Sequence, residues 1–155
     1  MGVFMDVLSL LRTDHDTVRD LFSKFENTTK TAYKEKQELF ERIRHELFLH
    51  SKAEEQVFYP AVKAFNGDGR KLIAQATREH KDIDDLLTQI SRMEPDDEGY
   101  VERVQALMDD VEYHIDGEEG QIFQFAKENC PREQLEQLAR EVEQRKSALM
   151  RQPAA

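Results

Sequence analysis

Two ionisable side chains lie on the apolar face of the longest helical pattern in this chain. The residues of this face recur at alternating steps of three and four, as in a helix packed inside a bundle: Phe40, Ile43, Leu47, His50, Glu54, Val57 and Ala61. An imidazole and a carboxylate without partners are costly in an apolar core. His50 and Glu54 are one helical turn apart, roughly 6 Å along the axis, so both reach one point of the core. Their spacing predicts a pair of metal ligands.

Three further helical patterns each place one histidine on their apolar face: His15, His80 and His114. Glu118 follows His114 by four residues and so repeats the first His-x-x-x-Glu pair. The two halves of the chain resemble each other, because His15 precedes the first pair by 35 residues and His80 precedes the second by 34. The repeat predicts pseudo-twofold symmetry with one ligand cluster in each half.

Helical patterns cover most of the sequence, and no strand-like alternation is present. We expect an all-α fold, an up-down-up-down four-helix bundle over about residues 6–129 with an additional C-terminal helix at about 131–151 packed outside it. The 155 residues suit a single domain, 1–155. Pro60 predicts a bend just past Glu54, Gly117 and Gly120 predict an irregularity beside the second pair, and residues 66–69 predict a turn.

Charge and composition narrow the class of protein. Asp and Glu number 32 against 22 Lys and Arg, and the formal charge of -10 argues against nucleic acid and against anionic membrane surfaces as partners. No apolar run approaches the roughly 20 residues of a membrane span. The single cysteine, Cys130, fits a reducing compartment. We expect a cytoplasmic protein.

The donor set indicates which metal the cluster binds. Four imidazoles and two bridging carboxylates offer eight donor contacts, which suit two ions rather than one. Structural zinc prefers a closed tetrahedron, and calcium and magnesium prefer oxygen, so the set favours iron, with manganese or zinc as alternatives. A hydrogen-bonded core without metal is the other interpretation, and it is a costly way to fill a core. Desolvation predicts lowered pKa values for the histidines and raised values for the glutamates.

Several polar residues lie beside the predicted ligands. Glu46 and Asp110 precede His50 and His114 by one turn, where they either orient these ligands or form surface salt bridges. Glu55 and Glu119 are offset from the apolar face, so we expect them to support the ligands from outside or to be solvated. His45 points about 140° away from His50 on an ideal helix, and we expect it to bind no metal.

Two tyrosines, Tyr59 and Tyr113, are close in sequence to the ligand pairs. They are candidates for hydrogen donors or redox residues. Amphipathic packing in the core is the favoured alternative for both.

The order His, His-x-x-x-Glu, His, His-x-x-x-Glu over four helices resembles the hemerythrin-like, or HHE cation-binding, domains, over roughly residues 6–129. The resemblance implies an oxo- or hydroxo-bridged di-iron centre in which Glu54 and Glu118 are the bridges and the remaining ligands are His15, His50, His80 and His114. Ferritin-like di-iron bundles differ, because their motif is Glu-x-x-His.

Two departures from the oxygen-carrying hemerythrins bear on function. Those proteins have a fifth histidine in the third helix, whereas here Ala76 and Asp84 flank His80 at four residues, and either Asp84 or water takes its place. Their fourth-helix carboxylate is an aspartate at a five-residue offset, whereas Glu118 is at four. The departures favour reaction with peroxide or binding of nitric oxide over reversible oxygen carriage. The expected partner is a small molecule, either peroxide or a diatomic ligand such as oxygen or nitric oxide. An iron reservoir or donor, an iron or gas sensor, and repair of iron–sulfur centres are the alternatives, and the protein partner is unknown.

Overall fold

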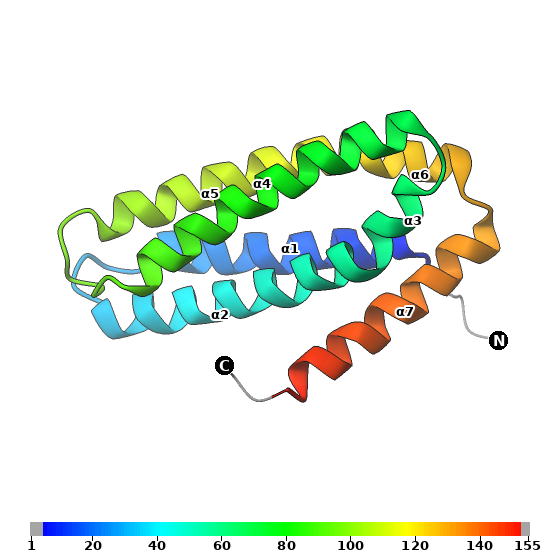
Figure 1. The fold of residues 1–155 in the computed structure, drawn as a ribbon. Coiled ribbons are helices and arrows are strands. Elements are labelled where there is room, and N and C mark those ends of the chain that lie inside the picture. The colour runs from blue at the N-terminus through cyan, green and yellow to red at the C-terminus, as the bar shows by residue number, and fades with distance from the viewer. Residues whose placement is uncertain (1–4, 153–155) are drawn as a thin grey trace.

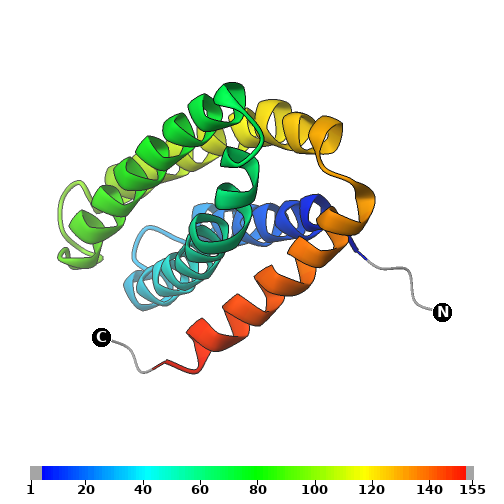
Figure 2. The same ribbon diagram turned by 45° about the vertical axis from the view of Figure 1, so that its right-hand side comes forward.

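A computed structural model describes residues 5–152 of the chain, and all regular structure in that range is helical. The elements are α1 (Val7–Glu26), α2 (Tyr33–Ala53), η1 (Glu54–Phe58), α3 (Tyr59–Lys63), α4 (Gly67–Ser91), α5 (Tyr100–Gly117), η2 (Glu118–Ile122), α6 (Phe123–Asn129) and α7 (Arg132–Met150). Figure 1 shows α1, α2, α4 and α5 running side by side as a bundle. The helix α7 packs outside it against α1, α2 and η1, and Figure 2 shows this from a second side. The predicted all-α bundle with an additional C-terminal helix is confirmed.

Local chemistry fixes two of the helix starts. The Asp6 carboxylate caps α1 by accepting a hydrogen bond of 2.9 Å from the backbone N–H of Ser9. The prediction of a turn at residues 66–69 is wrong for its last three residues, because the Asn66 side chain accepts from two backbone N–H groups and starts α4 at Gly67. Gly69 is required in this first turn, since a Cβ there would lie 2.5 Å from the Val62 carbonyl oxygen.

Each half of the chain contains one π-helical segment, which begins at the glutamate of its His-x-x-x-Glu pair. The segment η1 starts at Glu54 and η2 starts at Glu118. The irregularity expected near Gly117 and Gly120 is therefore this π-helical turn. Pro60 falls in the first turn of α3, where a missing N–H is tolerated. The chain turns at this point, and α3 leaves the axis of α2 in the direction of α4 (Figure 1). Single π-helical turns within α-helices are frequent at functional sites.

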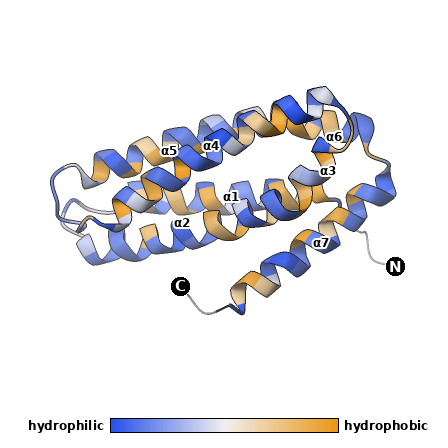
Figure 3. Cartoon of the chain, in the orientation of Figure 1, coloured by the Kyte–Doolittle hydropathy of each residue, from blue (hydrophilic) through white to orange (hydrophobic). Residues whose placement is uncertain are grey.

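The core consists of two apolar clusters with a polar layer between them. One cluster gathers around Leu11, Phe58 and Val142, and the other around Phe22, Phe40 and Leu107. In each of the four bundle helices the histidine lies between residues of the two clusters. Figure 3 shows apolar residues recurring along every helix between hydrophilic ones. No helix within residues 5–152 is both long enough and apolar enough to cross a membrane.

Candidate metal centre

The structure brings the six residues of the His/Glu pattern together in the polar layer, and all six side chains are buried. They form two groups, each with ligand atoms within 4.8 Å of one another. The first group is His15, His50, Glu54 and Glu118, and the second is Glu54, His80, His114 and Glu118. The two glutamates belong to both groups. This is the arrangement required of carboxylates that bridge two cations.

All four histidines turn Nε2 toward the glutamates. Glu54 Oε1 lies 3.1 Å from His50 Nε2 and 3.3 Å from His80 Nε2, so one oxygen faces both groups. Glu118 divides its two oxygens instead, with Oε1 3.1 Å from His15 Nε2 and Oε2 3.4 Å from His114 Nε2. In the second group His80 Nε2 also lies 3.1 Å from His114 Nε2.

Four buried atoms of this layer have no hydrogen-bond partner among the described residues: His15 Nε2, His50 Nε2, Glu54 Oε2 and Glu118 Oε1. The Nε2 atoms of His15 and His50 each lie 3.1 Å from a glutamate oxygen, but without the geometry of a hydrogen bond. A buried polar atom left unpaired costs roughly 1–3 kcal/mol. All four belong to the first group, and all are lone-pair donors suited to a cation. The residues present therefore fit a metal.

Each histidine has a carboxylate at its other ring nitrogen. The Nδ1···O distances are 2.6 Å from His15 to Glu119, 2.8 Å from His50 to Asp14, 2.8 Å from His80 to Glu55 and 2.7 Å from His114 to Glu79. An Nδ1–H donated to a carboxylate fixes the tautomer and directs Nε2 into the layer. Each carboxylate stands next in sequence to a candidate ligand, yet it binds a histidine of another helix.

Sequence reasoning missed Asp14 and Glu79. The signal was available, because the internal repeat aligns Asp14–His15 with Glu79–His80. Glu46 and Asp110 were expected either to orient the ligands or to form surface salt bridges, and within residues 5–152 neither contacts a histidine. Glu46 is half-buried and Asp110 is exposed. The Nδ1 positions that they would have contacted are taken by Asp14 and Glu79 from neighbouring helices.

Three further residues named in the sequence analysis lie away from the layer. Asp84 is exposed and belongs to neither group, so it does not replace the fifth histidine of the oxygen carriers. Tyr113 is 71% exposed, so it does not pack in the core, and its role as a hydrogen donor or redox residue stays a prediction. His45 is exposed, on another face of α2 than His50.

Tyr59 is the aromatic residue that reaches the layer. Its hydroxyl lies 3.2 Å from both Glu54 Oε1 and His80 Nε2, and it donates to Glu118 Oε2. Burial and the two carboxylates raise the pKa of Tyr59 well above its usual value. Tyr59 is the residue after η1, and the residue after η2 is Phe123, whose ring stacks 6.0 Å from that of His15. The hydroxyl therefore contacts His80 of the second group and the two shared glutamates, whereas an apolar ring faces His15 of the first group.

The charges in the layer reverse the expected pKa shifts of His50, His114 and Glu118. Burial acts to lower the pKa of His50, but the charge of Glu54 and the hydrogen bond to Asp14 outweigh it and raise the value to about 10. The pKa of His114 is also raised to about 10, against its burial, by Glu118 and Glu79. The pKa of Glu118 lies well below its usual value, because its hydrogen bonds to histidines outweigh burial. The prediction from desolvation alone was wrong for the pKa values of these three groups, because each group is paired with an opposite charge.

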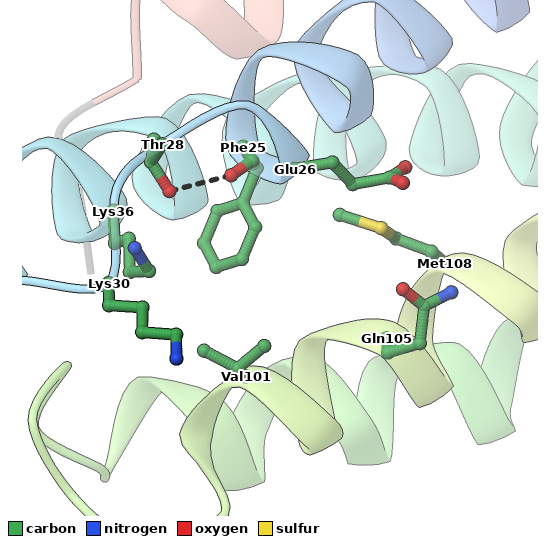
Figure 4. A pocket seen from close by; sticks show the side chains of 8 residues that line it. All are labelled: Phe25, Glu26, Thr28, Lys30, Lys36, Val101, Gln105 and Met108. Atoms are coloured by element: carbon green, nitrogen blue, oxygen red, sulfur yellow. Dashed lines mark hydrogen bonds between the residues drawn. The ribbon is translucent and has the colours of Figure 1, made fainter. Parts of the chain in front are cut away.

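A small cavity touches the histidines of the layer, and a larger hollow lies beside Tyr59 with none of the six residues in its lining. A cavity of about 10 Å³, room for roughly one water molecule, touches all four histidines and is walled by Val18, Leu47, Ser51, Ile83, Val111 and Ile115. A hollow of about 520 Å³ lies between η1, α3 and α4, and its lining includes Glu55 and Tyr59. The hollow in Figure 4, about 380 Å³ near the loop between α1 and α2, has none of the six residues in its lining.

Comparison with known proteins agrees with this geometry. The sequence model of the hemerythrin HHE cation binding domain matches residues 6–126. A DNA nickase of Nostoc sp. strain PCC 7120 is 32% identical over 145 residues, 94% of this chain and 40% of that protein. An uncharacterized hemerythrin-like protein of Schizosaccharomyces pombe is 28% identical over 102 residues, 65% of this chain and 50% of that protein. The chain thus spans half or less of the length of these two relatives.

A solved structure shares the fold. It is the crystal structure of a hemerythrin HHE cation binding domain-containing protein from Mycobacterium kansasii, with a TM-score of 0.81 and 24% sequence identity. The match covers 94% of this chain and 90% of that one. The agreement therefore extends beyond the four bundle helices to α7.

Proposed function

Because the chain belongs to the family of hemerythrin HHE cation-binding domains, we propose that its polar layer binds two iron ions and that the iron pair reacts with hydrogen peroxide. The observation that carries the metal assignment is the set of four buried, unpartnered donor atoms at His15, His50, Glu54 and Glu118. A mixture of imidazole and carboxylate donors suits iron better than the closed thiolate sites of zinc or the all-oxygen sites of calcium.

The division of ligands follows from the two groups. His15 and His50 would hold one ion, His80 and His114 the other, and Glu54 and Glu118 would hold both. Two bound iron ions would supply the electrons that peroxide accepts or returns. Carboxylates at all four Nδ1 atoms keep the imidazoles in the ligating tautomer and raise their basicity.

Two features of the chain favour a very small ligand. The cavity of about 10 Å³ beside the histidines admits a molecule of roughly the size of water, and most of its other lining is aliphatic. Peroxide, oxygen and nitric oxide, with two heavy atoms each, come near this limit, whereas an organic substrate far exceeds it. The walls formed by Val18, Ile83 and Val111 also exclude bulk water from the layer.

Tyr59 favours peroxide among these ligands. Its hydroxyl lies within 3.2 Å of His80 Nε2 and of Glu54 Oε1, and it is the one phenol in the layer. Its raised pKa keeps the hydroxyl proton in place at neutral pH. Peroxide needs a proton when its O–O bond breaks, whereas reversible binding of a diatomic gas does not, and Tyr59 can hold and deliver one there.

The name of the Nostoc relative raises nucleic acid as a substrate. This chain covers 40% of that protein, so its name does not assign an activity to the shared region. The formal charge of -10 opposes binding to a phosphate backbone. We therefore propose a small-molecule ligand for this chain and no nucleic acid.

The test is to load the protein with iron and to add peroxide, oxygen and nitric oxide separately while recording absorption spectra and peroxide consumption. We expect rapid peroxide loss that depends on iron and falls at least tenfold in Glu54→Ala, with His45→Ala unchanged. An intact iron-loaded protein that binds nitric oxide or oxygen but leaves peroxide untouched would instead support a gas-binding function.

A further inference from the structure

The C-terminal helix α7 reaches the candidate metal centre through one side chain. Lys146 Nζ bonds to Asp14 Oδ2, and the same oxygen meets His50 Nδ1 at 2.8 Å. The side chains of Lys146 and Asp14 are only 18% and 13% exposed. Residues 6–126 carry the family match, so Lys146 lies outside them. A cation from α7 is thus linked to a candidate ligand through a single carboxylate.

Of the other three outer carboxylates, two have more exposed cationic partners and one has none among the described residues. Glu55 lies 3.5 Å from Lys52 Nζ, and the Lys52 side chain is 37% exposed. Glu119 lies 3.8 Å from Arg12, which is 52% exposed. Among the described residues, Glu79 has no lysine or arginine partner and accepts a hydrogen bond of 3.0 Å from Gln75 instead.

Solvent screens the exposed pairs, but it screens the buried pair of Lys146 and Asp14 much less. The environments of the four histidines are therefore unequal. The carboxylate that contacts His50 has the closest and most buried cationic partner, Lys146. His114 has none within residues 5–152.

We propose that Lys146 is a positioning residue that weakens metal binding at the group of His15 and His50, and so makes the two metal positions unequal. The proposal rests on the metal-binding function proposed above. An ammonium on Asp14 draws electron density from the carboxylate, so that Asp14 accepts less strongly from His50 Nδ1–H. The imidazole is then a poorer electron donor at Nε2. The positive charge also repels a cation directly, and both effects act in the same direction.

The consequence is that the two metal positions differ in affinity. The ion at His80 and His114 is held by imidazoles with less cationic surroundings and is bound first. The ion at His15 and His50 is bound second and leaves first. Because Lys146 is on α7, any movement of this helix away from α1 would strengthen metal binding at His15 and His50.

The experiment is a Co²⁺ titration of the metal-free full chain, followed by the visible absorption of the bound ion. The unsubstituted chain should bind in two separable steps. Lys146→Met removes the charge but keeps most of the apolar stem, and we expect it to tighten the weaker step about tenfold. Lys146→Arg keeps the charge and should keep two steps. Lys52→Met is the matched control on the exposed pair and should change either step less than about twofold.

A second readout needs no metal. In the metal-free protein, the His50 Nδ1–H proton should move downfield in the NMR spectrum of Lys146→Met, because its hydrogen bond to Asp14 strengthens. Lys146→Arg should leave it in place. A merely structural role for Lys146 would lower the melting temperature without moving this proton.

The outcomes separate the two proposals. Unchanged Co²⁺ constants in Lys146→Met, or equal weakening of both steps, would overturn the role of Lys146 while leaving the metal site intact. An unsubstituted chain that binds no Co²⁺ and no iron would overturn the proposed function and this inference with it. A loss of the two-step pattern in Lys146→Arg would show that charge is not the cause.

Discussion

Replacing Tyr59 by Phe removes a hydroxyl from the middle of the polar layer and keeps the ring that packs 5.3 Å from that of His80. The hydroxyl has one proton, and the structure gives it to Glu118 Oε2, with Glu54 Oε1 at 3.2 Å as the other carboxylate within reach. The substitution therefore removes one hydrogen bond to a charged acceptor, worth roughly 1.5–3 kcal/mol. We expect the free energy of unfolding of the metal-free protein to fall by about 2 kcal/mol, which lowers its melting temperature by about 6 °C.

The assay is urea unfolding of the chelator-treated protein, followed by far-ultraviolet circular dichroism. Tyr113→Phe is the matched control, because the same hydroxyl is lost from a side chain that is 71% exposed, and its stability should change by less than about 0.5 kcal/mol. Equal stabilities of Tyr59→Phe and the unsubstituted protein would refute the reasoning, since they would mean that the hydroxyl does not bind a buried carboxylate. A more stable Tyr59→Phe would mean that the hydroxyl destabilises the folded protein.

Three further predictions address packing, alkaline stability and nucleic acid. Gly69→Ala should cost about 1–3 kcal/mol in urea unfolding, because its Cβ would lie 2.5 Å from the Val62 carbonyl oxygen, whereas Gly117→Ala meets nothing within 4 Å and should stabilise α5 by up to about 1 kcal/mol. Equal effects of the two would contradict the packing. Burial raises the pKa of Tyr100 from 10 to about 12, so its contribution to stability is complete below pH 10 and is lost as the pH rises through 12. Tyr100→Phe should flatten the fall in unfolding free energy over that interval and Tyr113→Phe should not; the same slope in both would be the contrary result. The chain should neither nick supercoiled plasmid nor shift duplex DNA in a gel at physiological salt, because its formal charge is -10. Magnesium- or iron-dependent nicking would reverse this prediction.

The helical spacing predicted the bundle and brought six side chains to one layer. This succeeded because steps of three and four residues confine side chains to one face of a helix, and four such faces must meet in the core. The buried positions of the four histidines could be predicted from each helix alone, without its neighbours: His15, His50, His80 and His114. The exposed position of His45 followed from the same geometry.

The position of Tyr59 could not be predicted in this way. Five residues separate it from Glu54, which corresponds to about 140° on an α-helix and would direct the phenol away from the layer. The π-helical segment Glu54–Phe58 changes this, because its backbone hydrogen bonds join residues five apart and bring Tyr59 onto the face of Glu54.

The supporting carboxylates depend on contacts between helices. Asp14 is next to His15 in sequence and faces away from that ligand, yet the packing of α1 on α2 places it 2.8 Å from His50 Nδ1. A single helical pattern contains no information on such a pair. The internal repeat did contain it, since Asp14 and Glu79 occupy equivalent positions in the two halves.

The central claim is that the polar layer holds two iron ions through Glu54 and Glu118, and the iron content per chain tests it most directly. Protein produced in iron-replete cells should contain about two irons per chain, and so should His45→Ala. Glu118→Ala, which loses the carboxylate whose two oxygens face His15 and His114, should contain less than about one. A single tightly held zinc per chain would contradict the account, and so would iron that is lost from His45→Ala but kept by Glu118→Ala.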